Sequence, residues 1–251
     1  MSKLLQLGRL GGLLSVLLAC APSAWATFPA FASACTVSAN GGTNSTTDTV
    51  NLPASIASGD LVLIFHNKDG GGTSTVPGSW VEIKDALSPG STSHVTIAYL
   101  IASGGETSVV VTTTVAERFT ALACRITGWH GTTPPEVSTG ATNTNNAPDP
   151  DSVTASWGSD DNLFIAVYSN DINATNNGYP SNYPDNRQNS GTTASAGLGA
   201  IASLNSASAS SNPNAFALTG SDQWWAGTVV VRPAAGGAAP SPKRTLMGVG
   251  T

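Results

Sequence analysis

Short runs in which apolar and polar residues alternate recur along the chain and are separated by turn residues. Alternation with a period of two is typical of half-buried β-strands, and short continuous apolar runs are typical of strands buried on both faces. In the first half the runs lie at 60–66, 80–84, 94–101, 109–115 and 118–127. In the second half they lie at 162–168, 194–204, 215–218 and 223–231. The pattern predicts an all-β protein.

The motifs of the second half follow those of the first half in the same order and at a nearly constant offset. The strand Gly59–Asp69 resembles Asp161–Asp171, and the turn Pro77–Trp80 resembles Pro180–Tyr183. The segments 94–103 and 118–126 have counterparts at 196–205 and 223–231. This preserved order indicates an internal duplication.

We therefore expect two pseudo-repeats, at about 50–130 and 150–233, joined by a Pro, Asn and Thr linker at 132–150. Each half is too small to build a secure core alone, so the apolar faces of the two halves should cover each other. The predicted fold of residues 27–233 is a two-sheet antiparallel β-sandwich of the jelly-roll kind. Two separate small sandwiches divided near residue 140 are the alternative.

Residues 1–26 have the pattern of an export signal. Lys3 and Arg9 precede the mostly apolar run Leu10–Cys20, and Ala24-Trp25-Ala26 offers a small-x-small cleavage site. The run is shorter than the about 20 apolar residues that cross a bilayer, so we expect no membrane span. Cleavage after Ala26 predicts an extracellular or cell-surface protein. Lipidation at Cys20 and a retained hydrophobic arm are the alternatives.

The last segment, 234–251, combines a Gly/Ala/Pro linker with an apolar end that contains Leu246, Met247 and Val249. A Gly/Ala/Pro segment of this kind makes a mobile tether. Three apolar side chains are too few to form a structure of their own, so we expect this tail to become ordered against a neighbouring subunit.

Charge narrows the range of partners. Charged residues make up 10% of the chain, against about 25% in ordinary domains, and the net charge is −5. Binding to nucleic acids depends on clustered Lys and Arg, so a nucleic-acid partner is not expected.

If residues 1–26 are removed, Cys35 and Cys124 are the cysteines that remain. An even number of cysteines in an exported protein makes this pair a candidate disulfide. The alternative is two unpaired cysteines that are buried as small apolar side chains.

Acidic residues form the candidate ion sites. Asp149 and Asp151 precede the first strand of the second half, and Asp160 and Asp161 lie directly before it. Carboxylates in loops are ligands for Ca²⁺, although Asp also stabilises turns by bonding its own backbone. The sequence has no motif of a serine hydrolase, a zinc protease, a dinucleotide-binding domain or a P-loop, so it predicts no catalytic residues and no cofactor besides Ca²⁺.

Aromatic residues at strand ends are the candidate ligand-binding residues: Trp80, Trp129, Trp157 and Tyr183. Their rings could stack on sugars, or they could cover the apolar ends of the sandwich. In the pair Trp224-Trp225 the two side chains must face opposite sides of one strand. We expect one of these rings in the core and the other exposed or covered by a neighbouring subunit.

Several short motifs between residues 28 and 233 carry a family resemblance: Gly59-Asp60-Leu61, Pro77-Gly-Ser-Trp80, Arg125-Ile-Thr-Gly-Trp129, Ser156-Trp-Gly158, and Ser221-Asp-Gln-Trp224 leading to Val231-Arg232-Pro233. In these motifs the chain resembles uncharacterised proteins of tailed bacteriophages and prophages that serve as virion structural components. The resemblance implies a structural role and brings no catalytic residues.

The sequence thus leads to three hypotheses of function. The first is a non-enzymatic structural or adhesive module of a phage particle or cell-surface assembly, in contact with neighbouring subunits as a homo-oligomer or particle. The second is a secreted carbohydrate-binding protein. The third is a polysaccharide-cleaving enzyme, which would need a pair of carboxylates that the sequence does not place.

Overall fold

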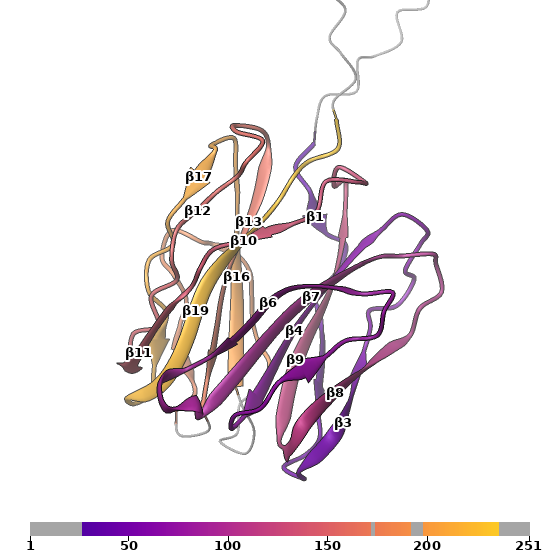
Figure 1. Ribbon diagram of the computed structural model, residues 1–251. Helices are drawn as coiled ribbons and strands as arrows, with labels where there is room; N and C mark the ends of the chain where they lie inside the picture. The colour runs from indigo at the N-terminus through magenta and orange to yellow at the C-terminus, as the bar shows by residue number, and fades with distance from the viewer. Residues whose placement is uncertain (1–26, 172–173, 192–197, 236–251) are drawn as a thin grey trace, which may run out of the picture.

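A computed structural model describes residues 27–171, 174–191 and 198–235 (Figure 1). The signal-like segment with Cys20 and the tail residues Leu246, Met247 and Val249 lie outside the described residues, so their predicted roles stay predictions.

The described part of the chain is built from β-strands, with one short 3₁₀ turn, η1 (Pro89–Ser91). The first half contains β1 (Ala30–Phe31), β2 (Thr36–Ala39), β3 (Ser45–Asn51), β4 (Leu61–Asp69), β5 (Ser74–Thr75), β6 (Val81–Leu87), β7 (Ser93–Ile101), β8 (Ser108–Glu117) and β9 (Phe119–Thr127). The second half contains β10 (Glu136–Val137), β11 (Ala141–Asn145), β12 (Val153–Thr154), β13 (Asn162–Asn170), β14 (Asn176–Gly178), β15 (Asp185–Asn189), β16 (Leu198–Ser206), β17 (Ser210–Ser211), β18 (Ala217–Leu218) and β19 (Asp222–Val231).

Two large antiparallel sheets form the centre of the molecule. The first sheet has the order β1-β9-β4-β7-β6, with β2 also paired to β9. The second sheet has the order β10-β19-β13-β16-β15, with β11 also paired to β19. The two strand orders correspond one for one. This correspondence is what an internal duplication would produce, and the duplication itself stays a prediction.

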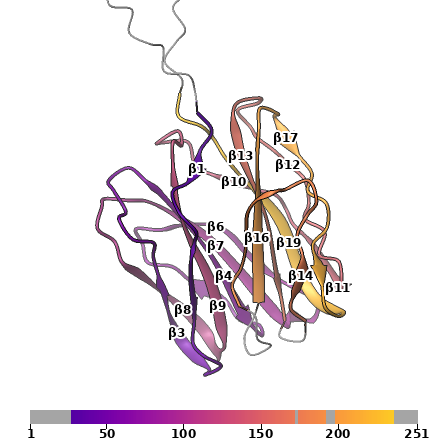
Figure 2. The same ribbon diagram turned by 180° about the vertical axis from the view of Figure 1, so that it is seen from behind.

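The two large sheets face each other, as Figures 1 and 2 show from opposite sides. One face of β4 contributes Leu61, Leu63 and Phe65 to the shared core, and β13 contributes Leu163, Ile165 and Val167. The antiparallel β-sandwich predicted from the alternating pattern is therefore confirmed.

Smaller sheets cover the outer faces of both large sheets, which makes four layers. Val62 and Ile64 of β4 pack on the sheet β3-β8-β5, through Val50, Val109 and Val111. Phe164, Ala166 and Tyr168 of β13 pack on the layer formed by β12-β17 and β14-β18, through residues such as Val153, Phe216 and Leu218. The sequence analysis expected two layers. The outer layers are needed because both faces of β4 and β13 are apolar and would otherwise face water.

The stretch 132–150 also differs from the prediction, because it is not a plain linker. It contains β10 and β11, and β11 pairs with β19 over five residues, from Ala141 opposite Ala226 to Asn145 opposite Asp222. β11 reads Ala-Thr-Asn-Thr-Asn and therefore contains almost no apolar residues. For this reason the hydrophobic pattern did not predict an edge strand at 141–145.

The shared core gives the first testable prediction. Phe65 is fully buried between the two large sheets, so Phe65→Ala should lower the free energy of unfolding by about 3–5 kcal/mol through lost burial and a cavity. Val110→Ala, on the outward face of β8, should cost no more than about 0.5 kcal/mol. Equilibrium denaturation of both variants checks this, and an equal cost for the two would contradict the assigned core.

Candidate functional site

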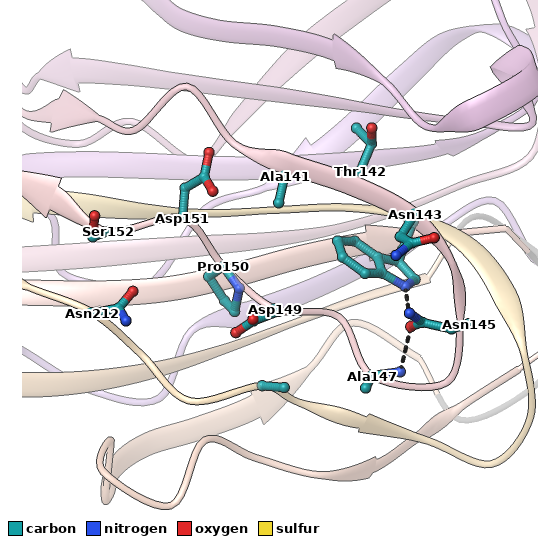
Figure 3. A pocket seen from close by; sticks show the side chains of 12 residues that line it. Ala141, Thr142, Asn143, Asn145, Ala147, Asp149, Pro150, Asp151, Ser152 and Asn212 are labelled. Carbon is teal, nitrogen blue, oxygen red and sulfur yellow. Dashed lines mark hydrogen bonds between the residues drawn. The ribbon is translucent and has the colours of Figure 1, made fainter.

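A polar groove lies beside β11 on the outer side of the second large sheet (Figure 3). It has a volume of about 530 Å³. Its polar lining includes Thr142, Asn143, Asn145, Asp149, Asp151 and Asn212. These side chains offer amide and carboxylate groups for hydrogen bonds and no positive charge, which suits a ligand rich in hydroxyl groups.

Asn145 is fixed in this groove by two hydrogen bonds. Its Oδ1 accepts from the indole Nε1 of Trp224 at 3.0 Å and from the backbone N of Ala147 at 2.8 Å (Figure 3). The Trp224 ring is buried, so it supports the groove from below and does not offer a free face. The sequence analysis missed Asn143, Asn145 and Asn212, although the Asn-rich stretch before Asp149 was a signal.

The predicted calcium ligands do not come together as one site. Asp149 and Asp151 line the groove, whereas Asp160 and Asp161 do not. The Asp160 carboxylate lies 3.7 Å from Arg232 Nε and also accepts from the backbone N of Asp161 at 3.0 Å. No group of three or more His, Cys, Asp or Glu side chains suited to a metal occurs within residues 27–171, 174–191 and 198–235. Asp160 thus bonds the backbone of its own turn, as the alternative interpretation expected of these aspartates, and it also lies beside Arg232.

Three of the four predicted stacking aromatics lie in the core. Trp80, Trp129 and Tyr183 are 8%, 5% and 0% exposed, and Trp129 Nε1 donates to the carbonyl of Gly59 at 2.8 Å. Burial also raises the pKa of Tyr183 to about 12. Trp129 and Tyr183 therefore pack in the core, whereas Trp80 also borders a pocket with Leu52 and Leu100.

Trp157 is half-buried and also has partners on its ring. Its Nε1 donates to Asn162 Oδ1 at 2.8 Å, and the guanidinium of Arg232 lies 6.0 Å from its ring centroid. Trp157 therefore joins the start of β13 to the end of β19, and it does not line the polar groove.

The prediction for Trp224 and Trp225 was wrong in one respect. Their rings face opposite sides of β19, as expected, but both are only 2% exposed. Trp225 lies in the core between the large sheets, and Trp224 lies under the outer layer of the second half. The outer layer, which the sequence analysis did not foresee, covers the ring that was expected to face a neighbour. Trp225 packs so closely on Gly140 that a Cβ at this glycine, whose φ is +87°, would overlap with the indole.

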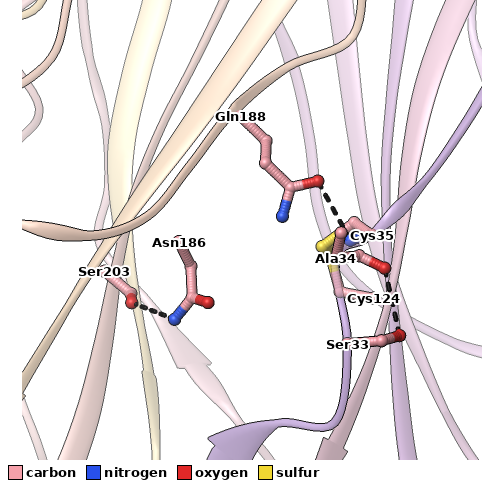
Figure 4. Close-up of a disulfide and its surroundings, with 7 residues drawn as sticks. All are labelled: Ser33, Ala34, Cys35, Cys124, Asn186, Gln188 and Ser203. Atoms are coloured by element: carbon pink, nitrogen blue, oxygen red, sulfur yellow. Dashed lines mark hydrogen bonds between the residues drawn. A yellow bond between two sulfur atoms is a disulfide. The ribbon is translucent and has the colours of Figure 1, made fainter.

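Cys35 and Cys124 form the disulfide that the sequence offered as a candidate (Figure 4). The bond joins the segment before β2 to the centre of β9, with a Cα–Cα distance of 4.4 Å across a sequence separation of 89 residues. The backbone N of Cys35 donates to Gln188 Oε1 at 3.0 Å, and Gln188 belongs to β15 in the second half (Figure 4). The disulfide therefore lies where the two halves meet.

A cluster of buried polar side chains lies between the first large sheet and the sheet β3-β8-β5. His66 Nε2 is 3.0 Å from Asp48 Oδ2, and both side chains are fully buried. Phe119 stacks on the His66 ring with centroids 5.3 Å apart. In the same layer, His94 Nδ1 is 3.3 Å from Ser74 Oγ, and His94 Nε2 also contacts Asp85 Oδ1.

Several atoms of this cluster are buried without a hydrogen-bond partner in the described part of the chain: Asp48 Oδ1, His66 Nδ1, Lys68 Nζ and Thr96 Oγ1. Burial lowers the pKa of His66, and the hydrogen bond to Asp48 opposes this effect. Burial also lowers the pKa of Lys68, against the opposing charges of Glu117 and Asp48. Unpaired buried polar groups are costly, so these atoms reduce the stability that the interior provides.

The sequence contained a signal for this cluster that the analysis did not use. His66 and Lys68 continue the face of β4 that begins with Val62 and Ile64, so alternation places all four on one side of the strand.

The described residues contain no helix with the length and hydrophobicity needed to cross a membrane. Comparisons with known proteins give no match to a protein family, to a curated protein or to a solved structure. The resemblance to phage structural proteins therefore stays a prediction.

The disulfide gives a second prediction. Replacing both cysteines, as Cys35→Ala with Cys124→Ala, should lower the free energy of unfolding by about 2–5 kcal/mol, because the unfolded chain regains the freedom of a long loop. Denaturation with and without a reductant measures this loss. The reductant should destabilise the parent protein and leave the double variant unchanged, and equal responses would contradict the bond.

Proposed function

We propose that this protein is a non-enzymatic structural or adhesive module of a phage particle or cell-surface assembly, in which it contacts neighbouring copies of itself. The observation that carries this proposal is the free edge of the first large sheet. β6 is the last strand in the order and pairs only with β7 in the described part of the chain. An unpaired strand edge is a template for pairing with another chain.

The edge strand β6 exposes apolar side chains, whereas the corresponding edge strand of the second sheet, β15, has none. Val81 and Leu87 are 48% and 40% exposed on β6. The corresponding edge of the second sheet is β15, which reads Asp-Asn-Arg-Gln-Asn and presents no apolar side chain. β6 also carries Glu82, Lys84 and Asp85, but it exposes apolar side chains that β15 lacks, so β6 is the edge that we assign to assembly.

The chain ends support display on a larger assembly. β1 pairs with β9 at Ala30 opposite Thr127, and the backbone N of Ala234 donates to the carbonyl of Gly128 at 2.8 Å. The first and last described residues therefore leave the sandwich at the same end (Figure 1). Attachment through either terminus would leave the opposite end of the sandwich free for contacts.

The tail of a neighbouring copy is the partner that fits this edge by composition. Lys243 and Arg244 could pair with Glu82 and Asp85 of β6, and the apolar residues Leu246, Met247 and Val249 could cover Val81 and Leu87. Main-chain pairing at a strand edge adds the affinity that three apolar side chains lack on their own.

The third prediction tests this assembly. Light scattering after size exclusion should show the full chain as an oligomer, and Val81→Lys with Leu87→Lys should weaken self-association at least about tenfold by placing charges on the edge. Val110→Lys is the matched control, because Val110 is 43% exposed but lies on β8, which belongs to a different sheet from β6. A parent protein that stays monomeric at all concentrations, or an oligomer that the β6 charges leave intact, would contradict the proposal.

A second candidate function is carbohydrate binding, which the polar groove favours. Its amide and carboxylate groups can bond to sugar hydroxyls, and its volume suits a short glycan. The glycan would bind in the groove beside β11 and not at the predicted aromatics Trp80, Trp129, Trp157 and Tyr183.

The fourth prediction tests the groove on a glycan array. Asn143→Ala and Asp149→Ala should each weaken binding about tenfold, because each removes hydrogen bonds worth about 1–1.5 kcal/mol. Asp185→Ala, which removes an exposed carboxylate of β15, should leave binding unchanged. The absence of any glycan that binds the parent protein would remove this second function.

A further inference from the structure

The buried polar cluster connects two layers of the first half. The pair His66–Asp48 joins β4 of the first large sheet to β3 of the outer sheet, and the contact His94–Ser74 joins β7 to β5. Apart from these contacts, the two layers are held together by the apolar residues of the same interface, such as Val62, Ile64 and Val111. The contacts His66–Asp48 and His94–Ser74 are thus buried polar interactions that link the sheet β3-β8-β5 to the first large sheet.

Ionisable groups from most strands of the two layers belong to this cluster. Asp48 on β3, Lys68 on β4 and His94 on β7 act on His66 itself, whereas Asp85 on β6 and Glu117 on β8 act on the neighbouring Lys68. Phe119 of β9 stacks on the His66 ring, and Ser74 of β5 contacts His94. The positive charge of Lys68 and any charge on His94 oppose a proton on His66, whereas the charge of Asp48 favours it.

Protonation of His66 is costly only while the two layers are closed. When Nε2 donates to Asp48, Nδ1 is the ring atom that takes up a proton, and Nδ1 is buried without a hydrogen-bond partner in the described part of the chain. If the outer sheet separates from β4, water reaches the ring and the proton is solvated. Proton uptake therefore favours the open arrangement over the closed one.

We propose that the His66–Asp48 contact is an acid-sensitive latch, which keeps the sheet β3-β8-β5 on the first large sheet near neutral pH and lets it open as the pH falls. This latch belongs to the fold and does not depend on the proposed assembly or on the groove. It would make the first half of the molecule responsive to the acidity of its surroundings.

The direction of the effect follows from the buried histidine. Burial lowers the pKa of His66 below its ordinary value of 6.5, and in the open arrangement the ring regains that value. Between the lowered value and 6.5 the open arrangement binds one more proton than the closed one. The equilibrium constant for opening should therefore rise by up to about tenfold for each pH unit of acidification within this window, and should not change with pH above it.

The second half is an internal control for this effect. All three histidines of the chain, His66, His94 and His130, lie before residue 131. The outer layer of the second half, formed by β12-β17 and β14-β18, packs on its large sheet without a histidine. If acid destabilised the whole molecule, both outer layers would open at low pH. If the latch is responsible, only the sheet β3-β8-β5 should open.

Hydrogen exchange of the full chain, expressed as protection factors at pH 7.5 and pH 5.5, tests the latch. We expect protection of β3 and β8 to fall severalfold, and by no more than about tenfold, relative to that of β12 and β18, because only the pH unit between 6.5 and 5.5 lies within this window. His66→Gln keeps a donor for Asp48 but does not titrate, so it should abolish this difference. His130→Gln, outside the cluster, should keep it.

An equal loss of protection in both outer layers, or an unchanged pH dependence in His66→Gln, would overturn the proposal. If His66→Gln does not fold, the titration of the His66 ring in the parent protein decides by NMR. A midpoint clearly below 6.5 that coincides with the opening of β3 and β8 supports the latch, and a midpoint at or above 6.5 refutes it.

Discussion

The burial of both faces of two strands is the constraint on which the whole structure depends. β4 and β13 are almost wholly buried, and each carries apolar side chains toward both neighbouring layers. A strand of this kind cannot lie at a surface, so each large sheet needs one layer on either side. The two large sheets bury each other's inner apolar faces, and the small outer sheets bury the outer apolar faces of the large sheets.

This constraint also determines where the buried ionisable groups and the polar groove lie. Where the outward face of β4 continues past Ile64, it carries His66 and Lys68 into the same closed layer, so polar groups are buried at the end of an apolar interface. At the other large sheet, the outer layer covers Trp224 and leaves a polar groove along β11. The cluster around His66 is buried and contains ionisable side chains, whereas the groove beside β11 is open to solvent and lined by amide side chains.

Much of the fold could be predicted from alternation alone, because the long strands β4, β7, β9, β13, β16 and β19 coincide with apolar runs of the sequence. The outer layers and β11 could not, since short strands of Thr, Ser and Asn carry little hydrophobic signal. The disulfide was a candidate from the cysteine count, but the spacing of Cys35 and Cys124 says nothing of their distance. The sequence left open whether the aromatics bind a ligand or cover the core, because burial of Trp129 and Tyr183 depends on contacts that are distant in sequence.

Amide hydrogen exchange at neutral pH tests the shared core most directly. If the two halves are stabilised by packing on each other, the central amides of β4 and β13 should exchange more slowly than those of all other strands and with the same opening free energy, because neither sheet can expose its inner face without the other. Separate opening free energies for β4 and β13, or faster exchange there than in the edge strands β6 and β15, would show that the halves do not share one core.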